Sequence, residues 1–401
     1  MIIKNASVYT EDGTFVPGDI FIQGKFFAAS RDAGMGGFLE DAGAEDMVID
    51  GSGCYAVPGL TDIHFHGCAG YDFSDGSEEA VKAMAQYEAS VGVTGMVPAA
   101  MTLGEEELLA VCRAAEAYNR SVGAGQLSDM HVPGTESGGR ARLYGIRMEG
   151  PFLSHGKKGA QNEAYLRTPD IALYDRLQKA SGNLIKLLDI APEIDGAMEL
   201  IGKLSGETVI SLAHTEADYE TAMKAFAKGA SHVTHLYNAM NGYTHREPGL
   251  IGAAADYESA RVELICDGVH VHPAAVRTTF KIFGDDRIIF ISDSMRAAGL
   301  GDGNYTLGGQ PVNVTGKRAL LQDGTIAGSV TNLTDCMRRA VLEMGIPLAS
   351  AVKCAAVNPA KCIGVYERCG SITPGKLANV LLLQKEDLEI LQVILEGELI
   401  G

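Results

Sequence analysis

The feature that most constrains the fold is a regular alternation of short apolar runs and amphipathic segments through the middle of this 401-residue chain. Short apolar runs bounded by turn residues are typical of buried strands. The segments between them, such as SEEAVKAMAQYEASVG and EADYETAMKAFAKG, have the apolar spacing of surface helices. Eight strand–helix units predict an α/β fold, a TIM-type (β/α)8 barrel. The expected strands are 59–64, 93–99, 143–149, 185–190, 208–213, 232–236, 262–266 and 288–292.

The two ends of the chain have a different pattern, with short β-like runs joined by Gly and Asp turns. Because chain termini often lie close together, we expect residues 1–56 and 366–401 to pair into one small β-sandwich module. Residues 57–365 then form the barrel that carries the chemistry. One connection, residues 121–141, is rich in Gly and Ser and is predicted to be a long mobile loop with no assigned role.

Composition excludes several classes of protein. The net charge is −18, and so acidic a surface repels nucleic acid and anionic lipid, so neither is expected as a partner. The N-terminal sequence MIIKNASVYTEDG lacks the features of a signal peptide, and no apolar run reaches the ~18 residues of a membrane span. The eight cysteines are dispersed without a CxxC pair, which favours reduced thiols and a cytoplasmic location.

Six residues with metal-binding or acid–base side chains fall at the ends of five predicted strands. In a barrel, catalytic groups sit where the strands finish. Two of the histidines are two residues apart in an extended segment, so both imidazoles can reach one cation. Imidazole and carboxylate ligands suit zinc, and ferrous iron accepts the same set. The six residues are His64, His66, Glu149, His214, His235 and Asp293.

This set of residue types predicts metal-dependent amide hydrolysis. A divalent ion lowers the pKa of a bound water to about 7 and so supplies hydroxide near neutral pH. Asp293 could take the proton of that water and pass it to the leaving amine, which an amide needs because an amide anion leaves poorly. The alternative role for Asp293 is to cap a following helix.

A series of motifs then points to a family. In chain order they are DIHFHG, EGPF, KKGA, AHT, THLYNAM, HREPG, DGVH, SDSM and AGS. In this order they resemble the N-acetylglucosamine-6-phosphate deacetylases of the amidohydrolase superfamily, and the resemblance covers nearly the whole chain. DIHFHG matches a pattern of many amidohydrolases, whereas EGPF with KKGA, followed by HLYNAM with HREPG, is much more specific. The resemblance implies hydrolysis of the acetamide of N-acetylglucosamine 6-phosphate to glucosamine 6-phosphate and acetate, in amino-sugar catabolism.

The resemblance also assigns roles to individual residues. It implies that Glu149, His214 and His235 are the main metal ligands and that Asp293 is the catalytic acid and base. It implies a sugar-phosphate substrate and a homodimer, in which an arginine can come from the neighbouring subunit. The implied substrate contacts are Ala160, Gln161, Asn238 and Ala239, the phosphate contacts Arg246 and His270, and a loop closing over the substrate, Ala327, Gly328 and Ser329.

Two departures from the family pattern bear on the metal. Some members lack the paired histidines of the first strand, whereas this chain has both His64 and His66. A second cation, bridged to the first by Glu149, is therefore a hypothesis, with one or two ions per chain. Many members carry histidine where this chain has Gln161, which donates a hydrogen bond only as a neutral amide.

Three rival interpretations remain open. N-acetylgalactosamine 6-phosphate differs from the glucosamine epimer at one hydroxyl, which sequence does not resolve. A cyclic amidase or dipeptidase often has a carboxylated lysine at the end of the fourth strand, but Lys186 lies in the first half of that strand and Asp189 is near its end. A sugar-phosphate-binding protein without activity would have no need of Asp293 as a proton shuttle.

Overall fold

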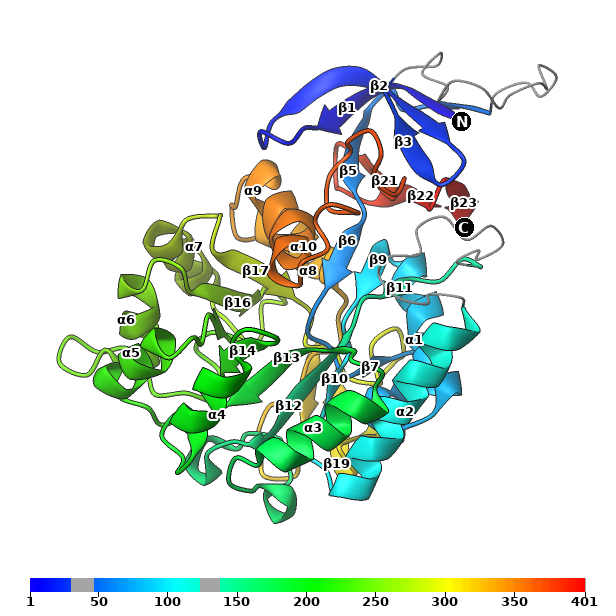
Figure 1. The fold of residues 1–401 in the computed structure, drawn as a ribbon. Helices are drawn as coiled ribbons and strands as arrows, with labels where there is room; N and C mark the ends of the chain where they lie inside the picture. The colour runs from blue at the N-terminus through cyan, green and yellow to red at the C-terminus, as the bar shows by residue number, and fades with distance from the viewer. Residues whose placement is uncertain (30–46, 123–137, 401) are drawn as a thin grey trace.

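The computed structural model describes residues 1–29, 47–122 and 138–400. The predicted mobile loop, residues 121–141, lies mostly outside the described residues. The molecule has two parts, a barrel and a separate sheet at one end (Figure 1). In the part of the chain that the structure describes, no helix is long and apolar enough to cross a membrane.

The barrel consists of parallel strands, as the alternating pattern predicts. Its strands are β6 (Leu60–Asp62), β9 (Val93–Met96), β10 (Ala99–Ala100), β11 (Arg142–Leu143), β12 (Ile146–Phe152), β13 (Ile185–Ile190), β14 (Val209–Leu212), β15 (His232–Val233), β16 (Arg261–Ile265) and β17 (Ile288–Ile291). Seven of them form one sheet in the order β10-β12-β13-β14-β15-β16-β17, and β11-β9-β6 form a second. The backbone N–H of Arg147 donates to Pro98 at 2.9 Å and that of Asp293 donates to His64 at 2.9 Å, which connects the two sheets on both sides. The TIM-type barrel is thereby confirmed.

Several strand ends differ from the prediction: β9 ends at Met96 and not at residue 99, β15 ends at Val233 and not at residue 236, and two further ends differ beside candidate ligands. The first strand ends at Asp62, because the chain then leaves the strand pairing and the carbonyl of His64 accepts the bond from Asp293 instead. The expectation that the third strand ends at Glu149 is wrong, since β12 continues to Phe152. Its pairing with β13 is irregular between Met148 and Phe152, so Glu149 lies at a break in the ladder.

Helices surround the barrel and alternate with its strands (Figure 1). Their polar caps explain where several begin: the side chain of Ser77 accepts from the N–H of Ala80, and that of Asp218 accepts from Thr221. Both helices named from sequence are present, as α1 and α5. The helices are α1 (Glu78–Ser90), α2 (Glu105–Ser121), α3 (Ile171–Ala180), α4 (Ala197–Leu204), α5 (Tyr219–Ala227), α6 (Gly249–Asp256), α7 (Pro273–Phe283), α8 (Leu333–Leu342), α9 (Leu348–Val352) and α10 (Asn358–Cys362).

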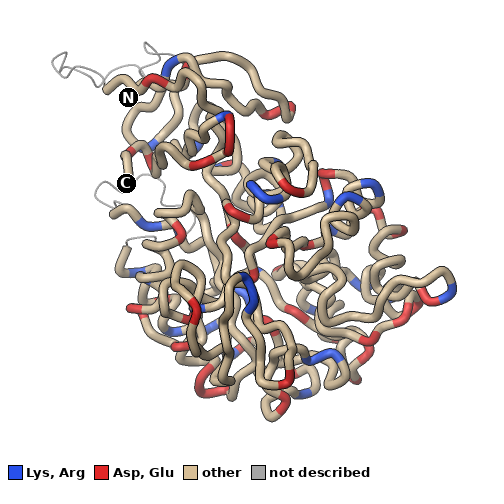
Figure 2. The backbone as a smooth tube through the Cα atoms, turned by 180° about the vertical axis from the view of Figure 1, so that it is seen from behind, with Lys and Arg blue, Asp and Glu red and all other residues tan. Residues whose placement is uncertain are grey.

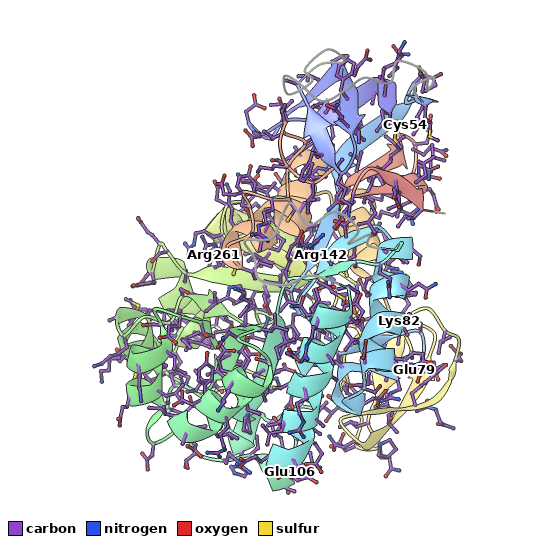
Figure 3. All side chains as sticks on the ribbon, turned by 45° about the vertical axis from the view of Figure 1, so that its right-hand side comes forward. Cys54, Glu79, Lys82, Glu106, Arg142 and Arg261 are labelled. Atoms are coloured by element: carbon purple, nitrogen blue, oxygen red, sulfur yellow. The ribbon has the colours of Figure 1, made fainter. Side chains whose placement is uncertain are left out.

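The two chain ends form one eight-stranded sheet, as predicted. Its strands are β1 (Ile2–Tyr9), β2 (Phe15–Gln23), β3 (Phe26–Ala28), β4 (Val48–Asp50), β5 (Cys54–Pro58), β21 (Val380–Gln384), β22 (Ile390–Leu395) and β23 (Glu398–Ile400). The N- and C-terminal halves meet where β21 pairs antiparallel with β5, with Leu382 opposite Ala56. Arg142, labelled in Figure 3, connects this sheet to the barrel through a hydrogen bond of 2.9 Å to the carboxylate of Glu396.

A small sheet that the sequence interpretation did not foresee lies beside the strand ends. It consists of β18 (Gly303–Leu307), β19 (Gln310–Thr315) and β20 (Arg318–Leu320), all antiparallel. Leu307, Val312 and Ala327 belong to its apolar core. The side chain of Gln310 donates to the carbonyl of Ala160, so this sheet is attached to the loop that follows β12.

Glu88 on α1 is an unusual member of the barrel core. It is 1% exposed, and neither carboxyl oxygen has a hydrogen-bond partner among the residues that the structure describes. Burial, reinforced by the nearby carboxyl of Asp62, raises the pKa of Glu88 well above its ordinary value. Glu88 is therefore neutral in the folded protein, whereas the unfolded chain ionises it near its ordinary pKa of about 4.3.

This difference predicts a pH-dependent effect of Glu88→Gln on stability. The pKa of Glu88 is raised on folding. Its contribution to the free energy of unfolding is therefore fully present below about pH 4.3. Above that pH the contribution decreases by about 1.4 kcal/mol per pH unit, until the pH reaches the pKa of the folded state. We expect the variant to melt at a higher temperature than the original at pH 8 and at a similar temperature at pH 4. Thermal unfolding across this range tests it, with Glu207→Gln in an exposed turn as control. A constant offset at every pH would contradict the assignment.

Candidate active site

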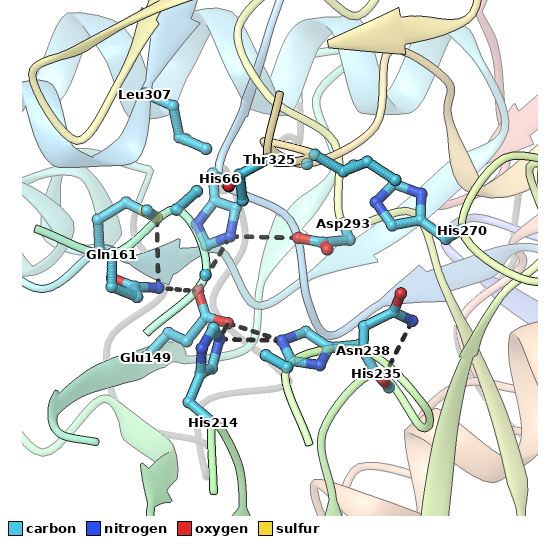
Figure 4. Close-up of a pocket in the computed structure, with 16 residues that line it drawn as sticks. His66, Glu149, Gln161, His214, His235, Asn238, His270, Asp293, Leu307 and Thr325 are labelled. Atoms are coloured by element: carbon cyan, nitrogen blue, oxygen red, sulfur yellow. Dashed lines mark hydrogen bonds and ion pairs between the residues drawn. The ribbon is translucent and has the colours of Figure 1, made fainter. Parts of the chain in front are cut away.

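All six candidate ligands lie together beyond the ends of the barrel strands, and all of them except His64 are labelled in Figure 4. They form two groups, and within each group one ligand atom per residue lies within 4.8 Å of the others. All six side chains are buried, and His64 is fully inaccessible to solvent. The first group is Glu149, His214 and His235, and the second group is His64, His66 and Asp293.

Glu149 lies between the two groups. Its Oε1 is 3.1 Å from Nε2 of His214 and 3.1 Å from Nε2 of His235. Its other oxygen, Oε2, is 3.1 Å from Nε2 of His66. In the second group, Oδ1 of Asp293 is 3.2 Å from the same Nε2 of His66. One carboxylate thus faces both groups, the arrangement that a bridging ligand requires.

Hydrogen bonds behind the imidazoles fix which nitrogen faces the centre. Nδ1 of His66 lies 3.1 Å from the carbonyl of Ala99, and Nδ1 of His214 lies 2.8 Å from the carbonyl of Lys157. A carbonyl only accepts, so in both rings Nδ1 carries the proton and Nε2 is free to bind a cation. This is the usual support for metal-binding histidines.

The donor set fits a divalent cation. Nε2 of His64 is buried and has no hydrogen-bond partner among the described residues, although a bare ring nitrogen in that position is costly. Nε2 of His214 and Nε2 of His235 lie 3.2 Å apart. A tetrahedral zinc with ligands at about 2.1 Å would separate its ligand atoms by about 3.4 Å. The converging nitrogens therefore have the spacing of atoms that share one ion.

The backbone at these positions is strained. His214, His235 and Asp293 all have positive φ, at 44°, 25° and 48°. For residues other than glycine this costs about 1–3 kcal/mol each and is concentrated at functional sites. Each lies two residues beyond the end of its strand, and all three side chains line the pocket above the barrel. Gly328 allows the close approach here, since a Cβ on it would lie 2.9 Å from the carbonyl oxygen of Asp293.

The two carboxylates of the cluster are ionised. Burial alone would raise the pKa of Glu149, but His64, His66, His214 and His235 outweigh it and hold that pKa well below its ordinary value. Burial likewise opposes the ionised form of Asp293, and the adjacent imidazole of His66, together with that of His64, outweighs it, so the pKa of Asp293 is lowered. An ionised carboxylate is the form that binds a cation or accepts a proton from water.

The cluster forms one side of a pocket of about 220 Å³. Of the residues assigned to substrate by resemblance, Ala160, Gln161, Asn238, Ala239, His270 and Gly328 line it. Ala327 and Ser329 are buried beside the lining, and Arg246 is exposed on the segment between β15 and α6. Asn238 caps no helix, because it lies in a turn and its amide donates to the carbonyls of His235 and Leu236.

The side chain of Gln161, expected to contact substrate, already has hydrogen-bond partners within the protein. Its Nε2 donates to Oε2 of Glu149 at 2.7 Å, and its Oε1 accepts from the backbone N–H of Thr102 at 2.8 Å. The side chain is 2% exposed. Gln161 therefore holds the oxygen of Glu149 that faces His66 and lies at the edge of the pocket.

Gln161→Ala is consequently expected to reduce turnover modestly, by about tenfold. The reason is that Glu149 loses one hydrogen bond to an ionised group, worth about 1.5–3 kcal/mol, yet keeps its contacts with the histidines. Steady-state kinetics would show this as a fall in kcat with metal content retained. A loss as large as that of Asp293→Asn would instead place Gln161 directly in the chemistry.

Sequence interpretation missed the buried polar residues beneath the cluster. Among them are Arg147 in β12 and Glu263 in β16, both fully inaccessible to solvent. Arg147 forms a bidentate ion pair with Asp189, at 3.0 and 2.8 Å. The available signal was a charged residue inside an otherwise apolar strand, since such a residue is rarely fully buried without a partner.

Comparisons with known proteins agree with this geometry. Residues 145–400 match the amidohydrolase family, and the chain belongs to that family. It is 34% identical over 402 residues to the N-acetylglucosamine-6-phosphate deacetylase of Bacillus subtilis (strain 168), covering 100% of this chain and 96% of that protein. It is also 33% identical over 344 residues to the N-acetylgalactosamine-6-phosphate deacetylase of Escherichia coli O157:H7, covering 85% of this chain and 86% of that one.

A solved structure shows the same architecture. The N-acetyl-D-glucosamine-6-phosphate deacetylase from Mycobacterium smegmatis, in a variant crystallised with N-acetyl-D-glucosamine 6-phosphate, superposes with a TM-score of 0.86 and 30% identity. That match covers 100% of this chain and 98% of the other. The resemblance noted from the motifs to the family of these deacetylases is confirmed.

Proposed function

We propose that this protein hydrolyses the acetamide of N-acetylglucosamine 6-phosphate to glucosamine 6-phosphate and acetate, a step of amino-sugar catabolism. The observation that carries the proposal is the position of Asp293 beside two histidine groups that Glu149 connects, on one side of a pocket. The relatives with N-acetylglucosamine-6-phosphate deacetylase names support the substrate.

The residues of the chain divide the reaction between them. A divalent cation held by Glu149, His214 and His235 would polarise the acetyl carbonyl and make a water acidic near neutral pH. Asp293 accepts the proton of the attacking water at its carboxylate and delivers it to the departing amine. Nε2 of His64 and Nε2 of His66 lie 3.8 and 3.2 Å from this carboxylate, and a cation held there would keep Asp293 ionised until the proton arrives.

Zinc is the metal that we propose, and the geometry favours two positions. Ferrous iron accepts the same ligands, so the identity of the ion needs a measurement. The second group, with the orphaned Nε2 of His64, supports a second cation beside the first. Elemental analysis of protein saturated with metal tests the number: two equivalents per chain are expected, and one or fewer would contradict the second position.

A dimer would complete the phosphate site. No lysine or arginine is among the described residues that line the pocket, and acidic residues are spread over both parts of the chain (Figure 2). A phosphate therefore needs a cation from elsewhere. Arg246 is exposed on a segment that projects beyond α5 and α6 (Figure 1), and we propose that it reaches the pocket of a second subunit, where His270 also contacts the phosphate.

Mixed dimers test this arrangement. Arg246→Ala is expected to raise KM about 10- to 100-fold, because a charge-assisted hydrogen bond to phosphate is lost. A mixed dimer of Arg246→Ala with Asp293→Asn has one pocket with both intact groups, so it should regain about half of the original activity per dimer. Co-expression with two affinity tags isolates it. No recovery would mean that Arg246 serves its own subunit, and an unchanged KM in the Arg246→Ala homodimer would mean that it serves neither pocket.

The galactosamine epimer is the second candidate substrate, because one similar relative carries that name. The cyclic amidase or dipeptidase alternative loses support: Lys186 packs against Gly145 near the start of its strand, and Asp189 is paired with Arg147. Acetate release from both sugar phosphates and from unphosphorylated N-acetylglucosamine tests the proposal. We expect kcat/KM to be highest for N-acetylglucosamine 6-phosphate, whereas activity on the epimer alone would change the substrate and keep the mechanism.

The location that we propose is the cytoplasm. All eight cysteines are free and buried, and none is paired in a disulfide. Free thiols are typical of proteins in a reducing compartment, where disulfides are rare. We also propose that the chain divides into the N-terminal part of the β module (1–56), the barrel (57–365) and the C-terminal part of the β module (366–401). The positions of the strands support these bounds.

A further inference from the structure

A buried carboxylate lies directly behind the two histidine groups. Glu263, in the middle of β16, is fully inaccessible to solvent. Its Oε2 is 3.0 Å from Nδ1 of His64 and accepts the backbone N–H of His235 at 3.1 Å. One carboxylate oxygen therefore contacts a residue of each group.

The other oxygen of Glu263 faces a guanidinium and an imidazole. Oε1 contacts the guanidinium of Arg147 and is 2.9 Å from Nε2 of His232. Arg147 has no acceptor atom, and its five N–H groups are directed at Glu263, Asp189, Thr234 and the carbonyl of Ile63. Oε1 of Glu263 must therefore accept a hydrogen bond from Arg147, whose own position is fixed by its other hydrogen bonds.

This arrangement fixes the tautomer of His64. Because the carboxylate only accepts, the proton of His64 is on Nδ1, and Nε2 presents a lone pair toward Glu149 at 3.5 Å and Asp293 at 3.8 Å. His66 and His214 obtain the same tautomer from backbone carbonyls. His64 differs in that its tautomer depends on a side chain, and a side chain can be replaced.

We propose that Glu263 is a positioning residue that selects the tautomer of His64 and thereby forms the second cation position, between His64, His66 and Asp293. The inference rests on the proposed function only for the presence of a cation there. In Glu263→Gln the amide oxygen is expected to face Arg147, because an NH2 group opposite the charged guanidinium is less favourable than one beside the neutral backbone N–H of His235. The amide NH2 then points at Nδ1 of His64, which moves the proton of His64 to Nε2 and into the cation position.

Metal binding by the whole protein tests the inference. Chelator-treated protein is dialysed against a series of Zn²⁺ concentrations, and bound zinc per chain is measured for the original protein, Glu263→Gln and His232→Gln. We expect two equivalents for the original, with the second bound about 10- to 100-fold more weakly in Glu263→Gln. His232→Gln removes a contact of the other oxygen only and should retain both.

Each outcome bears on one claim. Two equivalents bound with unchanged affinity by a folded Glu263→Gln variant would overturn the positioning role. So would a single equivalent in the original protein, which would also remove the second cation from the proposed function. Two equivalents in the original without acetate release would contradict the proposed function alone and leave the role of Glu263 standing.

If Glu263→Gln does not fold, the original protein still tests the claim. In zinc-loaded protein with ¹⁵N-labelled histidine, the ring nitrogen shifts report the tautomer of each imidazole. His64 is assigned by the signals missing from His64→Asn. A proton on Nδ1 of His64 is the expected result, and an unprotonated Nδ1 would overturn the proposal.

Discussion

Asp293→Asn is expected to lower kcat by roughly 10²–10⁴-fold, the usual contribution of a general acid–base group. The substitution keeps the size of the side chain and removes its capacity to accept a proton. The backbone around it should persist, because the N–H of Asp293 bonds to His64 and its carbonyl accepts from Ser329. The cation held by Glu149, His214 and His235 should also remain, since none of these ligands changes.

Controls must show that the fall in kcat of Asp293→Asn does not come from unfolding or from loss of zinc. Kinetics, zinc content and thermal unfolding are measured on the same preparation, with Asp175→Asn on the exposed face of α3 as a control for the same chemical change. The control should retain full activity. A loss of less than tenfold in Asp293→Asn, with zinc bound, would transfer the proton-transfer role to another group.

Arg147→Met is expected to have the largest effect on stability, about 3–5 kcal/mol. The methionine fills part of the space but leaves Asp189 and Glu263 buried in the barrel without their cation. Breaking a buried ion pair in this way is strongly destabilising, because the remaining charges cannot be solvated. The free energy of unfolding from denaturant titration measures the loss.

Two further variants distinguish the effect of breaking a buried ion pair on stability from the effect of removing an exposed charge. Arg176→Met removes an exposed partner of Glu105 and should cost at most about 1 kcal/mol. Arg147→Lys keeps the positive charge but has fewer hydrogen-bond donors. Its loss of free energy of unfolding should lie between those of Arg176→Met and Arg147→Met. Equal effects of Arg147→Met and Arg176→Met would show that the buried network contributes little to stability.

The barrel could be predicted because its strands repeat one pattern. Parallel strands place their carboxyl ends at one face, so a histidine or carboxylate at each end implies a common site without knowledge of any contact. His64, His214 and Asp293 were found in this way, and the structure places them in one buried cluster. That the two chain ends share one sheet followed from their similar patterns, whereas the pairing of β5 with β21 is known from the structure alone.

Other features depend on contacts that one sequence does not state. Arg147 and Glu263 are far apart in the chain, so their ion pair appears only when the curved sheet brings β12 and β16 to face each other across the barrel. The small sheet was missed although β19 alternates exposed and buried residues, because its partner strands are short. Gln161 was expected at the substrate, and its bond to Glu149 depends on the path of a loop.

The most direct test of the central claim is acetate release from N-acetylglucosamine 6-phosphate by chelator-treated protein during titration with zinc. The cluster of histidines and carboxylates predicts no activity without metal and a return of activity in proportion to bound zinc, with Asp293→Asn inactive at full occupancy. Acetate release by the metal-free protein, or a zinc-saturated protein that releases none, would contradict metal-dependent deacetylation at this site.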